Sequence, residues 1–505
     1  MKMDNDYLPY DYLHLEQRQL QNSVVEELSV KSKNKSRWQW AFGTYAAYQW
    51  LRTDAPVYMG SDMNKFLSKH ITDYAYNGML AAMTKRLAAD MIKRGMPEDK
   101  AMEAAAIAAK AAIARAGGVR INMQMEPISE LFRTPTFNLG LYHESNINIT
   151  NHLLATLGLR YDYSHVAIHY DTSARLLLDE SVMGINIKPT ITSTLAHNEK
   201  NHFKQLLPKI GLTYQLNDGS NVYATWSKGY RAGGFNIQMF SDILQTELSS
   251  AAQGARGDVD VEHDEAYYNN IAKTIAYKPE TSFNYEIGAH LNLQGGQMRL
   301  DLAAYYMQIK NKHLSVLANN YGFGRMMTNA GKSHSCGAEA TLRGGALNDN
   351  LSYGVSYGFT SATFDEYSET NATGVKINYK DKRVPFVPQH TLSANADYLI
   401  NVDPAALLDP TNKFHLRSVT VGLNMVAQGK TYWDELNTIA QNFYATVGAH
   451  ADANFGSMHI NLWVRNLTDT KYNTFAVQSG ATGTKYTFGQ LGNPFQIGVD
   501  IPLHF

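Results

Sequence analysis

Hydrophobic and polar residues alternate along many segments of this chain. The clearest case is the last eleven residues, where every second position is apolar: Phe495, Ile497, Val499, Ile501, Leu503 and Phe505. Because successive side chains of a strand point to opposite faces, this pattern predicts a strand with one apolar and one mostly polar face. The segment also has the length of about 9–11 residues that a strand needs to cross a lipid bilayer.

The same alternation recurs along the chain, in residues 153–163, 210–216, 285–293, 353–359, 392–400 and 419–425. The positions between the apolar residues carry Gly, Ser, Thr, Asn and charged side chains. No apolar run has the length of a transmembrane helix, whereas the strands of a membrane barrel are only half apolar. We therefore predict an all-β fold, a transmembrane antiparallel β-barrel, with roughly fifteen strands in this chain.

The links between these strands fall into two length classes. Short links at 217–220, 294–296 and 455–457 alternate with long ones at 232–281, 365–387 and 466–493. Outer-membrane barrels have short periplasmic turns and long extracellular loops. This sorting predicts that the long links are extracellular and that the chain ends on the periplasmic side.

Residues 61–118 interrupt the alternation. Apolar residues recur there at helical spacing, at Met79, Leu80, Met83, Leu87 and Met91. Gly95 then breaks the pattern, and an Ala-rich run at 101–116 follows. We predict two helices joined by a turn, inserted in an extracellular loop. The insertion is either a hairpin packed on the barrel rim or a lid or partner-binding element over a ligand site.

Composition narrows the class of protein further. The 31 Tyr residues outnumber 19 Phe and 6 Trp, and Tyr suits a membrane–water interface because its ring is apolar and its hydroxyl is wet. The net charge of −1 gives no support for a nucleic-acid partner. The single Cys336 cannot form an internal disulfide, and residues 1–20 contain no apolar segment of a secretory signal.

Four segments carry a resemblance to one family. They are "PKIGLTYQLNDGSNVYATWSKGYRAGGFN" (208–236), "KPETSFNYEIGAHLNL" (278–293), "NAGKSHSCGAEATL" (329–342) and "NLWVRNLTDTKY" (461–472). In this order, and with the end at Phe505, the chain resembles the TonB-dependent outer-membrane receptors from about residue 21 onward, with one interruption.

The resemblance implies a receptor in the outer membrane of a Gram-negative bacterium that takes up a scarce nutrient. An iron–siderophore complex is the commonest ligand of such receptors. The implied partners are membrane lipid, the barrel-assembly machinery through the C-terminal strand, and the TonB energy-transducing complex through an N-terminal plug. The resemblance implies no enzyme activity, cofactor or metal site.

The chain departs from this family pattern at its N-terminal side. Receptors of the family have 22 strands around a plug, and neither a plug nor a TonB-contact segment is recognisable here. A chain that begins outside and ends inside has an odd number of strands, whereas single-chain bacterial barrels have an even number. We therefore expect residues 1–505 to be an N-terminally truncated barrel domain that lacks the plug and the first strands.

Candidate ligand-binding residues lie in the long links. Aromatic side chains beside amides suit a flat chelate, a sugar or a peptide, and they occur at Tyr267, Tyr268, Tyr277, Tyr432 and Trp433. The motif residues are expected to serve folding rather than ligand contact: Gly233, Gly234, Glu339, Asn466, Asp469 and Phe505. The two glycines can adopt a positive φ and turn the chain at the barrel rim, and Asn466 and Asp469 can satisfy backbone groups where a strand gives way to a loop.

No motif places a nucleophile beside a base, so no catalytic residue is predicted. His165 and His169 lie on one face of a predicted strand, about 13 Å apart, which is too far to share a metal ion. His197 and His202 flank a predicted loop and could approach each other. Two alternative functions are a passive porin-like channel and, with less support, a soluble β-sandwich that binds glycans.

Overall fold

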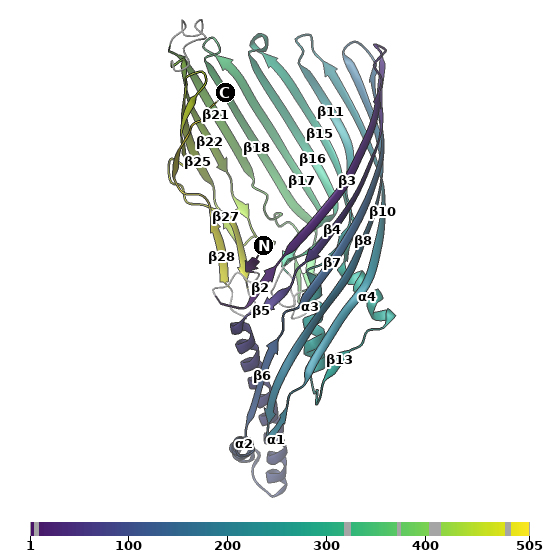
Figure 1. The fold of residues 1–505 in the computed structure, drawn as a ribbon, viewed down its shortest axis with the longest axis vertical. Helices are drawn as coiled ribbons and strands as arrows, with labels where there is room; N and C mark the ends of the chain where they lie inside the picture. Colours follow the sequence, from purple (N-terminus) through teal and green to yellow (C-terminus); the bar gives the residue numbers. More distant parts are fainter. Residues whose placement is uncertain are drawn as a thin grey trace.

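The structure is a computed structural model that describes residues 2–4, 10–317, 325–370, 375–402, 416–479 and 486–503. Figure 1 shows a tall curved wall of long antiparallel strands, with helices at one end. Phe505, which the sequence singles out, lies outside the described residues.

Among the described residues, fifteen strands form the wall, and each pairs antiparallel with the next in chain order. They are β3 (Arg18–Lys31), β4 (Trp38–Asp54), β7 (Ser129–Asn148), β8 (Leu153–Val182), β10 (Thr190–Gln215), β11 (Asn221–Arg231), β15 (Glu280–Leu293), β16 (Met298–Leu317), β17 (Arg325–Ala346), β18 (Leu351–Glu366), β21 (His390–Asn401), β22 (Ser418–Gln428), β25 (Tyr444–Asn454), β26 (His459–Arg465) and β29 (Gln496–Asp500). The predicted antiparallel barrel fold is confirmed. The strands form one continuous sheet, which contradicts the β-sandwich alternative.

Three short strands, β6 (Val119–Met125), β9 (Ile185–Ile187) and β13 (Val259–Val261), extend this wall to an 18-stranded sheet. A separate small sheet contains β1 (Lys2–Asp4), β2 (Leu13–Glu16) and β5 (Val57–Met59). The remaining strands form two-stranded ribbons: β12 (Gly234–Phe235) with β14 (Ala276–Tyr277), β19 (Ser368–Thr370) with β20 (Lys376–Asn378), β23 (Thr431–Tyr432) with β24 (Ala440–Gln441), and β27 (Asn473–Ser479) with β28 (Tyr486–Leu491).

The helices in the described part of the chain are α1 (Ser61–Lys93), α2 (Glu98–Arg115), α3 (Met239–Ala252), α4 (Glu265–Ile275) and the 3-10 turn η1 (Gln294–Gly296). The two helices expected between residues 61 and 118 are present as α1 and α2. Gly95 has a φ of 92° at the turn between them. Four α2 side chains are buried at four-residue spacing: Ala101, Ala105, Ala109 and Ile113. Within the described residues, no helix is both long enough and apolar enough to cross a membrane.

Apart from residues 402–417, most of which lie outside the described residues, the links are sorted between the two ends of the wall as the sequence predicts. Short links at 149–152, 216–220, 294–297, 347–350 and 455–458 lie at the upper end in Figure 1. Gly219 and Gly456 hold two of these turns with φ of 79° and 87°, where a side chain would be strained. The long links, with α1 to α4, lie at the opposite end, which we call the loop end.

The two faces of the wall differ as the alternation predicts. Large apolar side chains are exposed on one face; for example, Ile287 is 64% exposed and Ile497 69%. The other face is polar and crowded. There Asp301 accepts hydrogen bonds from Arg299 and Arg343 at 3.0 and 2.8 Å. An apolar exterior around a polar lumen is the arrangement of outer-membrane barrels, so we call these the outer and inner faces.

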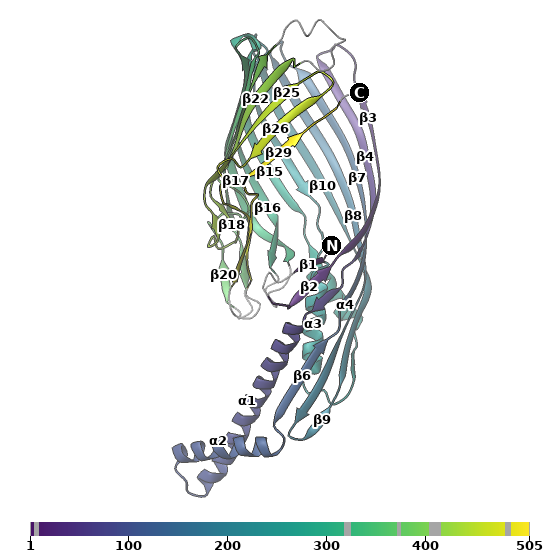
Figure 2. The same ribbon diagram turned by 60° about the vertical axis from the view of Figure 1, so that its left-hand side comes forward.

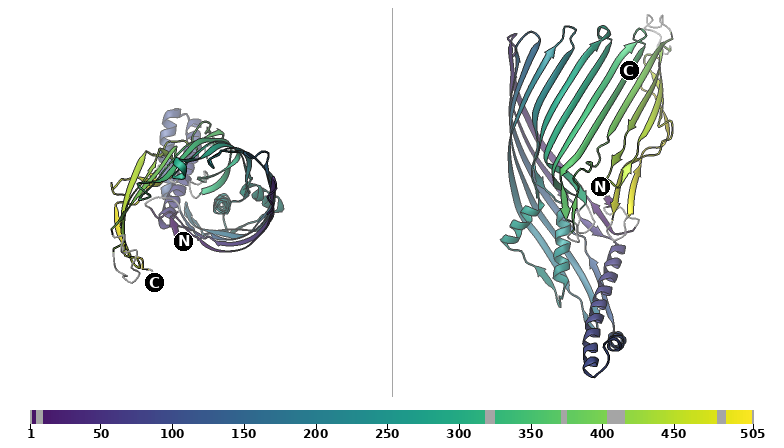
Figure 3. Two further views of the ribbon diagram at one scale, coloured as in Figure 1. Left: turned by 90° about the horizontal axis from the view of Figure 1, so that it is seen from above. Right: turned by 180° about the vertical axis from the view of Figure 1, so that it is seen from behind.

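The wall is open in the structure. The end-on view in Figure 3 shows its purple and yellow ends apart. All 14 residues of β3 are exposed, although the strand pairs with β4 along its length. Exposure of every residue is typical of a strand at a sheet edge, where one side lacks a neighbour.

The loop end contains a hydrophobic core. Phe132 in β7, Ile168 and Leu176 in β8, and Leu244 in α3 are each fully buried, together with Ile275 of α4. Strands β7, β8 and β10 run on from the wall, and α3 and α4 lie beside their extensions (Figure 2). This core fixes the long loop between β11 and β15 as a folded unit.

Two motif predictions have different outcomes. Neither Gly233 nor Gly234 has a positive φ, so the expected left-handed turn is wrong. These glycines instead allow close approach, because a Cβ on Gly233 would lie 2.3 Å from the Tyr277 carbonyl oxygen. Asn466 and Asp469 do satisfy backbone groups: the Asn466 amide donates to the Asn493 carbonyl at 2.9 Å, and Asp469 accepts from the backbone N–H of Phe495 at 3.0 Å.

Glu339 lies in the middle of β17, paired with Ala303 of β16 and Gly358 of β18. The register places it on the inner face of the wall, because Gly288 and Glu286 of β15 share that face. Its side chain is exposed there. A charged residue on the lumen face meets water rather than lipid.

Candidate ligand-binding site at the loop end

Helix α4 positions the first two predicted aromatic residues. The helix begins after Asp264, whose carboxylate accepts the backbone N–H of Tyr267 at 2.7 Å as an N-cap. Tyr268 lies on the next position and stacks on His197 of β10, with ring centroids 4.6 Å apart and an interplanar angle of 16°. The cap therefore fixes two tyrosines against the wall extension.

Tyr267 belongs to a buried polar cluster centred on Glu247 of α3. The hydroxyl groups of Tyr267 and Ser193 both donate to the Glu247 carboxylate. His263 Nε2 lies 3.2 Å from the same carboxylate, and both side chains are less than a tenth exposed. Burial and the adjacent Glu247 raise the pKa of Tyr267, so its phenol remains neutral. The cluster ties α3, α4 and β10 together.

Tyr277 occupies a different place, in the ribbon of β12 and β14. Its ring meets His313 of β16 edge-on, with centroids 5.1 Å apart, and its hydroxyl packs against Gly234. Burial raises the pKa of Tyr277. The residue closes the base of the loop rather than facing the same space as Tyr267.

Tyr432 and Trp433 lie in a third place, in the loop that contains β23. The Lys430 ammonium group lies 4.7 Å from the centre of the Tyr432 ring, a cation–π arrangement. Trp433 meets Phe386 edge-on at 5.4 Å. Its indole N–H is buried and has no hydrogen-bond partner among the described residues. The structure thus divides the five predicted aromatic residues among three locations.

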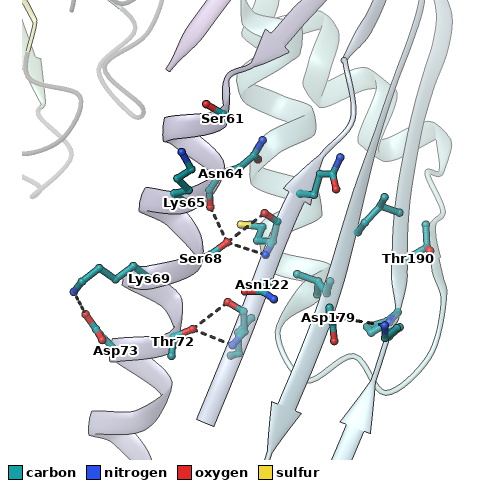
Figure 4. Close-up of a pocket in the computed structure, with 17 residues that line it drawn as sticks. Ser61, Asn64, Lys65, Ser68, Lys69, Thr72, Asp73, Asn122, Asp179 and Thr190 are labelled. Carbon is teal, nitrogen blue, oxygen red and sulfur yellow. Dashed lines mark hydrogen bonds and ion pairs between the residues drawn. The ribbon is translucent and has the colours of Figure 1, made fainter. Parts of the chain in front are cut away.

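A groove that the sequence did not predict lies between α1 and the β6–β8 sheet, with a volume of about 900 Å³ (Figure 4). Most of the residues that line it are polar, and they include Lys65, Lys69, Asp73, Asn122, Gln124, Asp179, Lys188 and Thr190. Lys69 pairs with Asp73 at 2.5 Å, and Lys188 with Asp179 at 3.5 Å. Mixed charges and amides of this kind can bind a small polar ligand.

One wall of this groove is built by hydrogen bonds between a helix and a strand edge. Thr72 Oγ1 accepts from the backbone N–H of Ile121 at 2.9 Å and donates to its carbonyl at 3.0 Å. Ser68 makes the same pair of contacts with Met123, at 2.9 and 3.3 Å. Hydroxyl groups on one face of α1 therefore bond the backbone groups at the edge of β6 that a neighbouring strand would otherwise bond. Polar residues at positions 64, 68 and 72 were the signal for this face.

The four histidines that the sequence singled out lie on strands β8 and β10. In the described ranges, no three His, Cys, Asp or Glu side chains are placed to hold an ion. His197 and His202 both lie within β10, so the expected loop between them is wrong. His202 pairs with His165 across the strands, with ring centroids 4.7 Å apart, and accepts or donates at 2.9 Å to the hydroxyl of Tyr163.

The fold and the loop end together define a class of protein: an outer-membrane-type β-barrel whose long loops are folded at one end of the wall. A family model described as "TonB dependent receptor-like, beta-barrel" matches residues 115–467. The chain therefore belongs to the TonB-dependent receptor β-barrel family.

The chain is also similar to known proteins in sequence or in fold. The pesticin receptor of Yersinia pestis is 24% identical over 290 residues, which are 56% of this chain and 34% of the relative. The ferric yersiniabactin uptake receptor FyuA from Yersinia pestis superposes over 98% of this chain and 56% of its own, with 17% identity and a TM-score of 0.62. The siderophore receptor PiuA from Acinetobacter baumannii has 15% identity, a TM-score of 0.56, and coverage of 97% and 56%. The chain thus spans about half the length of the solved receptors and a third of the curated relative.

Proposed function

We propose that this chain is part of an outer-membrane receptor that takes up an iron–siderophore complex, with the loop end outside the cell and the short links in the periplasm. The observation that carries the proposal is the pairing of an apolar outer face with a folded, aromatic-bearing loop end. Family membership and the likeness to siderophore receptors support it. Energy from TonB and insertion by the barrel-assembly machinery belong to the same proposal.

The ligand contacts that we propose are Tyr268 and the aromatic loop at Tyr432 and Trp433. Tyr268 is only partly buried above His197, and Trp433 has an indole N–H without a partner among the described residues. Flat aromatic surfaces beside hydrogen-bond donors suit the chelating rings of a ferric siderophore. Tyr267 and Tyr277 act through the packing of their loops.

A titration of the full chain in detergent micelles tests the ligand class. Ferric catecholate, hydroxamate and phenolate siderophores would be compared with cobalamin and with an oligosaccharide, and binding read from tryptophan fluorescence. We expect at least one ferric siderophore to bind, and the Tyr268→Ala and Trp433→Ala variants to bind it about tenfold more weakly, as loss of about 1.4 kcal/mol implies.

A matched control is Tyr285→Ala, since Tyr285 is an aromatic residue on the outer face of the wall and is 47% exposed. This variant should bind like the parent protein. Binding of the oligosaccharide alone, or siderophore binding that none of the loop variants weakens, would refute the proposal. A steady ion conductance in planar bilayers without ligand binding would favour the porin-like alternative.

A further inference from the structure

A small cavity at the loop end lies apart from the aromatic residues and from the groove beside α1. It is enclosed by β2, β5, the start of β7 and the first turns of α3. Its volume of about 30 Å³ has room for one ion or one water molecule. Five of its eleven lining residues are apolar, among them Leu13, Val57 and Ile237, so a charged group inside the cavity is poorly solvated.

Glu130 lines this cavity. The residue is 3% exposed, and its Oε1 atom is buried with no hydrogen-bond partner in the described part of the chain. The backbone of Ser241 in α3 donates to the carboxyl group, which supports only part of it. A buried carboxylate with an unpartnered oxygen is costly unless a proton or a cation compensates it.

A second acid, Asp242, lines the same cavity. Burial and the Asp242 charge raise the pKa of Glu130 well above its usual range, and burial raises the pKa of Asp242 to about 7. The other polar lining residues are Ser241 and three amides, Gln17, Gln238 and Gln245. The polar side chains of the cavity therefore present oxygen ligands and no imidazole or thiol.

We propose that this cavity binds a hard divalent cation, Ca²⁺ in the first instance, with Glu130 and Asp242 as its carboxylate ligands and amide oxygens completing the shell. Carboxylate and amide oxygens are the ligands of Ca²⁺ and Mg²⁺ rather than of Zn²⁺ or Cu²⁺. Ca²⁺ fits better because it accepts irregular shells, whereas Mg²⁺ retains several waters for which this cavity has no room.

The bound cation would join parts of the chain that are far apart in sequence. Glu130 is the second residue of β7, and its backbone carbonyl accepts a hydrogen bond from the Ala55 N–H at 2.9 Å. Asp242 lies on α3. A cation between them fastens the long loop of α3 to the wall and to the β1–β2–β5 sheet. With two carboxylates, the site belongs to the weak class of extracellular calcium sites, with a Kd of about 10⁻⁴–10⁻³ M.

Calorimetric titration of the full chain in micelles with CaCl₂ tests the proposal, after dialysis against a chelator. We expect one Ca²⁺ per chain, weaker binding of Mg²⁺, and a rise in the unfolding midpoint with Ca²⁺. Glu130→Gln and Asp242→Asn should each weaken Ca²⁺ binding at least tenfold. Asp73→Asn, which removes an acid from the groove beside α1, is the matched control and should bind Ca²⁺ unchanged.

If the variants fail to fold, the pH dependence of Ca²⁺ binding to the parent protein still tests the proposal. Glu130 and Asp242 are the titratable groups that line the cavity, so Ca²⁺ competes with their protons and should bind more tightly at pH 8 than at pH 6. The absence of Ca²⁺ binding at both pH values would overturn the proposal. In that case the two acids bind protons and no cation. The free energy of unfolding would then fall as the pH rises through about 7, because the pKa values of both acids are raised in the folded state.

Discussion

In the two halves of the continuous strand β8, the apolar side chains lie on opposite faces. In the first half, apolar side chains at odd positions face outward; Leu157 is 47% exposed and Leu159 49%. In the second half, apolar side chains at even positions are buried on the inner face; Ile168 and Leu176 are each 0% exposed. The register with β10 continues through both halves without a shift, so the change lies in the side chains and not in the backbone.

This contrast locates the edge of the membrane-facing wall. Outward apolar residues are stable where lipid covers them, and inward apolar residues where α3 and α4 cover them. The phase of the alternation changes at residues 164–166, close to the Tyr163–His202 hydrogen bond. Strand β10 changes in the same way: Leu206 is 51% exposed on the outside, while Leu195 is 0% exposed in the core. The loop end is therefore built like a soluble domain on a membrane wall.

The largest expected effect comes from the core half. Phe132→Ala removes a fully buried ring that packs on Phe240 with centroids 5.2 Å apart. We expect a loss of about 3–5 kcal/mol from the stability of the loop end, measured by hydrogen exchange of the α3 amides. Phe42→Ala removes the same side chain from the outer face, where it is 48% exposed, and should leave α3 protection unchanged. Equal effects of the two variants would break the comparison.

A second variant tests the wall half. Leu157→Arg puts a charge on the outer face, which we expect to cost about 2–4 kcal/mol in a bilayer if the position is near the midplane. The adjacent Thr156 lies on the inner face, where it donates to Asn146 at 2.7 Å. Thr156→Arg should therefore cost much less. Urea titrations of folding into lipid vesicles measure both. A larger cost for Thr156→Arg would reverse our assignment of the two faces.

The third effect concerns the helix that covers the β6 edge. Thr72→Val removes the hydroxyl that pairs with both backbone groups of Ile121, and it leaves the shape nearly unchanged. We expect a loss of about 1–3 kcal/mol, because buried backbone groups lose their partner. Faster exchange of the Ile121 amide should accompany it. If that exchange rate stays the same, α1 does not act as the replacement for a strand.

The smallest expected effect is that of an exposed ion pair on the same helix. Lys69→Gln breaks the contact with Asp73, where the two side chains are 78% and 56% exposed. An exposed pair at this helical spacing is worth about 0.3–0.5 kcal/mol. The helical circular dichroism melting curve should shift slightly, and less in high salt. A shift as large as that of Thr72→Val would mean that the ion pair, rather than the hydrogen bonds of the Ser68 and Thr72 hydroxyl groups, holds α1 on β6.

The strands and their faces could be predicted from the sequence because a strand repeats every two residues whatever surrounds it. The outward set in β15 and the α1–α2 pair with its turn at Gly95 follow from local spacing alone. The phase change in β8 was also visible in the sequence, since Leu157 and Leu159 give way to Ile168 and Leu176 at positions of opposite parity. It passes unnoticed when each short alternating run is taken separately.

The partners of the loop residues could not be predicted in this way. Tyr267 and Tyr268 are neighbours in sequence, yet one donates to Glu247 and the other stacks on His197. The two glycines at 233–234 are needed for close packing on Tyr277 and not for a turn. These contacts join residues separated by tens of positions, so no local pattern carries them.

The sequence by itself determined the class of this protein: period-two alternation, sorted links and ordered motifs define a wall strand by strand, because each depends on residues next to one another. Only the tertiary structure decided what the loop end contains. The packing of α1, α3 and α4 decides three features: Glu130 and Asp242 line one cavity, hydroxyl groups of α1 bond the edge of β6, and the predicted aromatic residues lie apart. Burial and long-range contact, rather than local periodicity, set that packing.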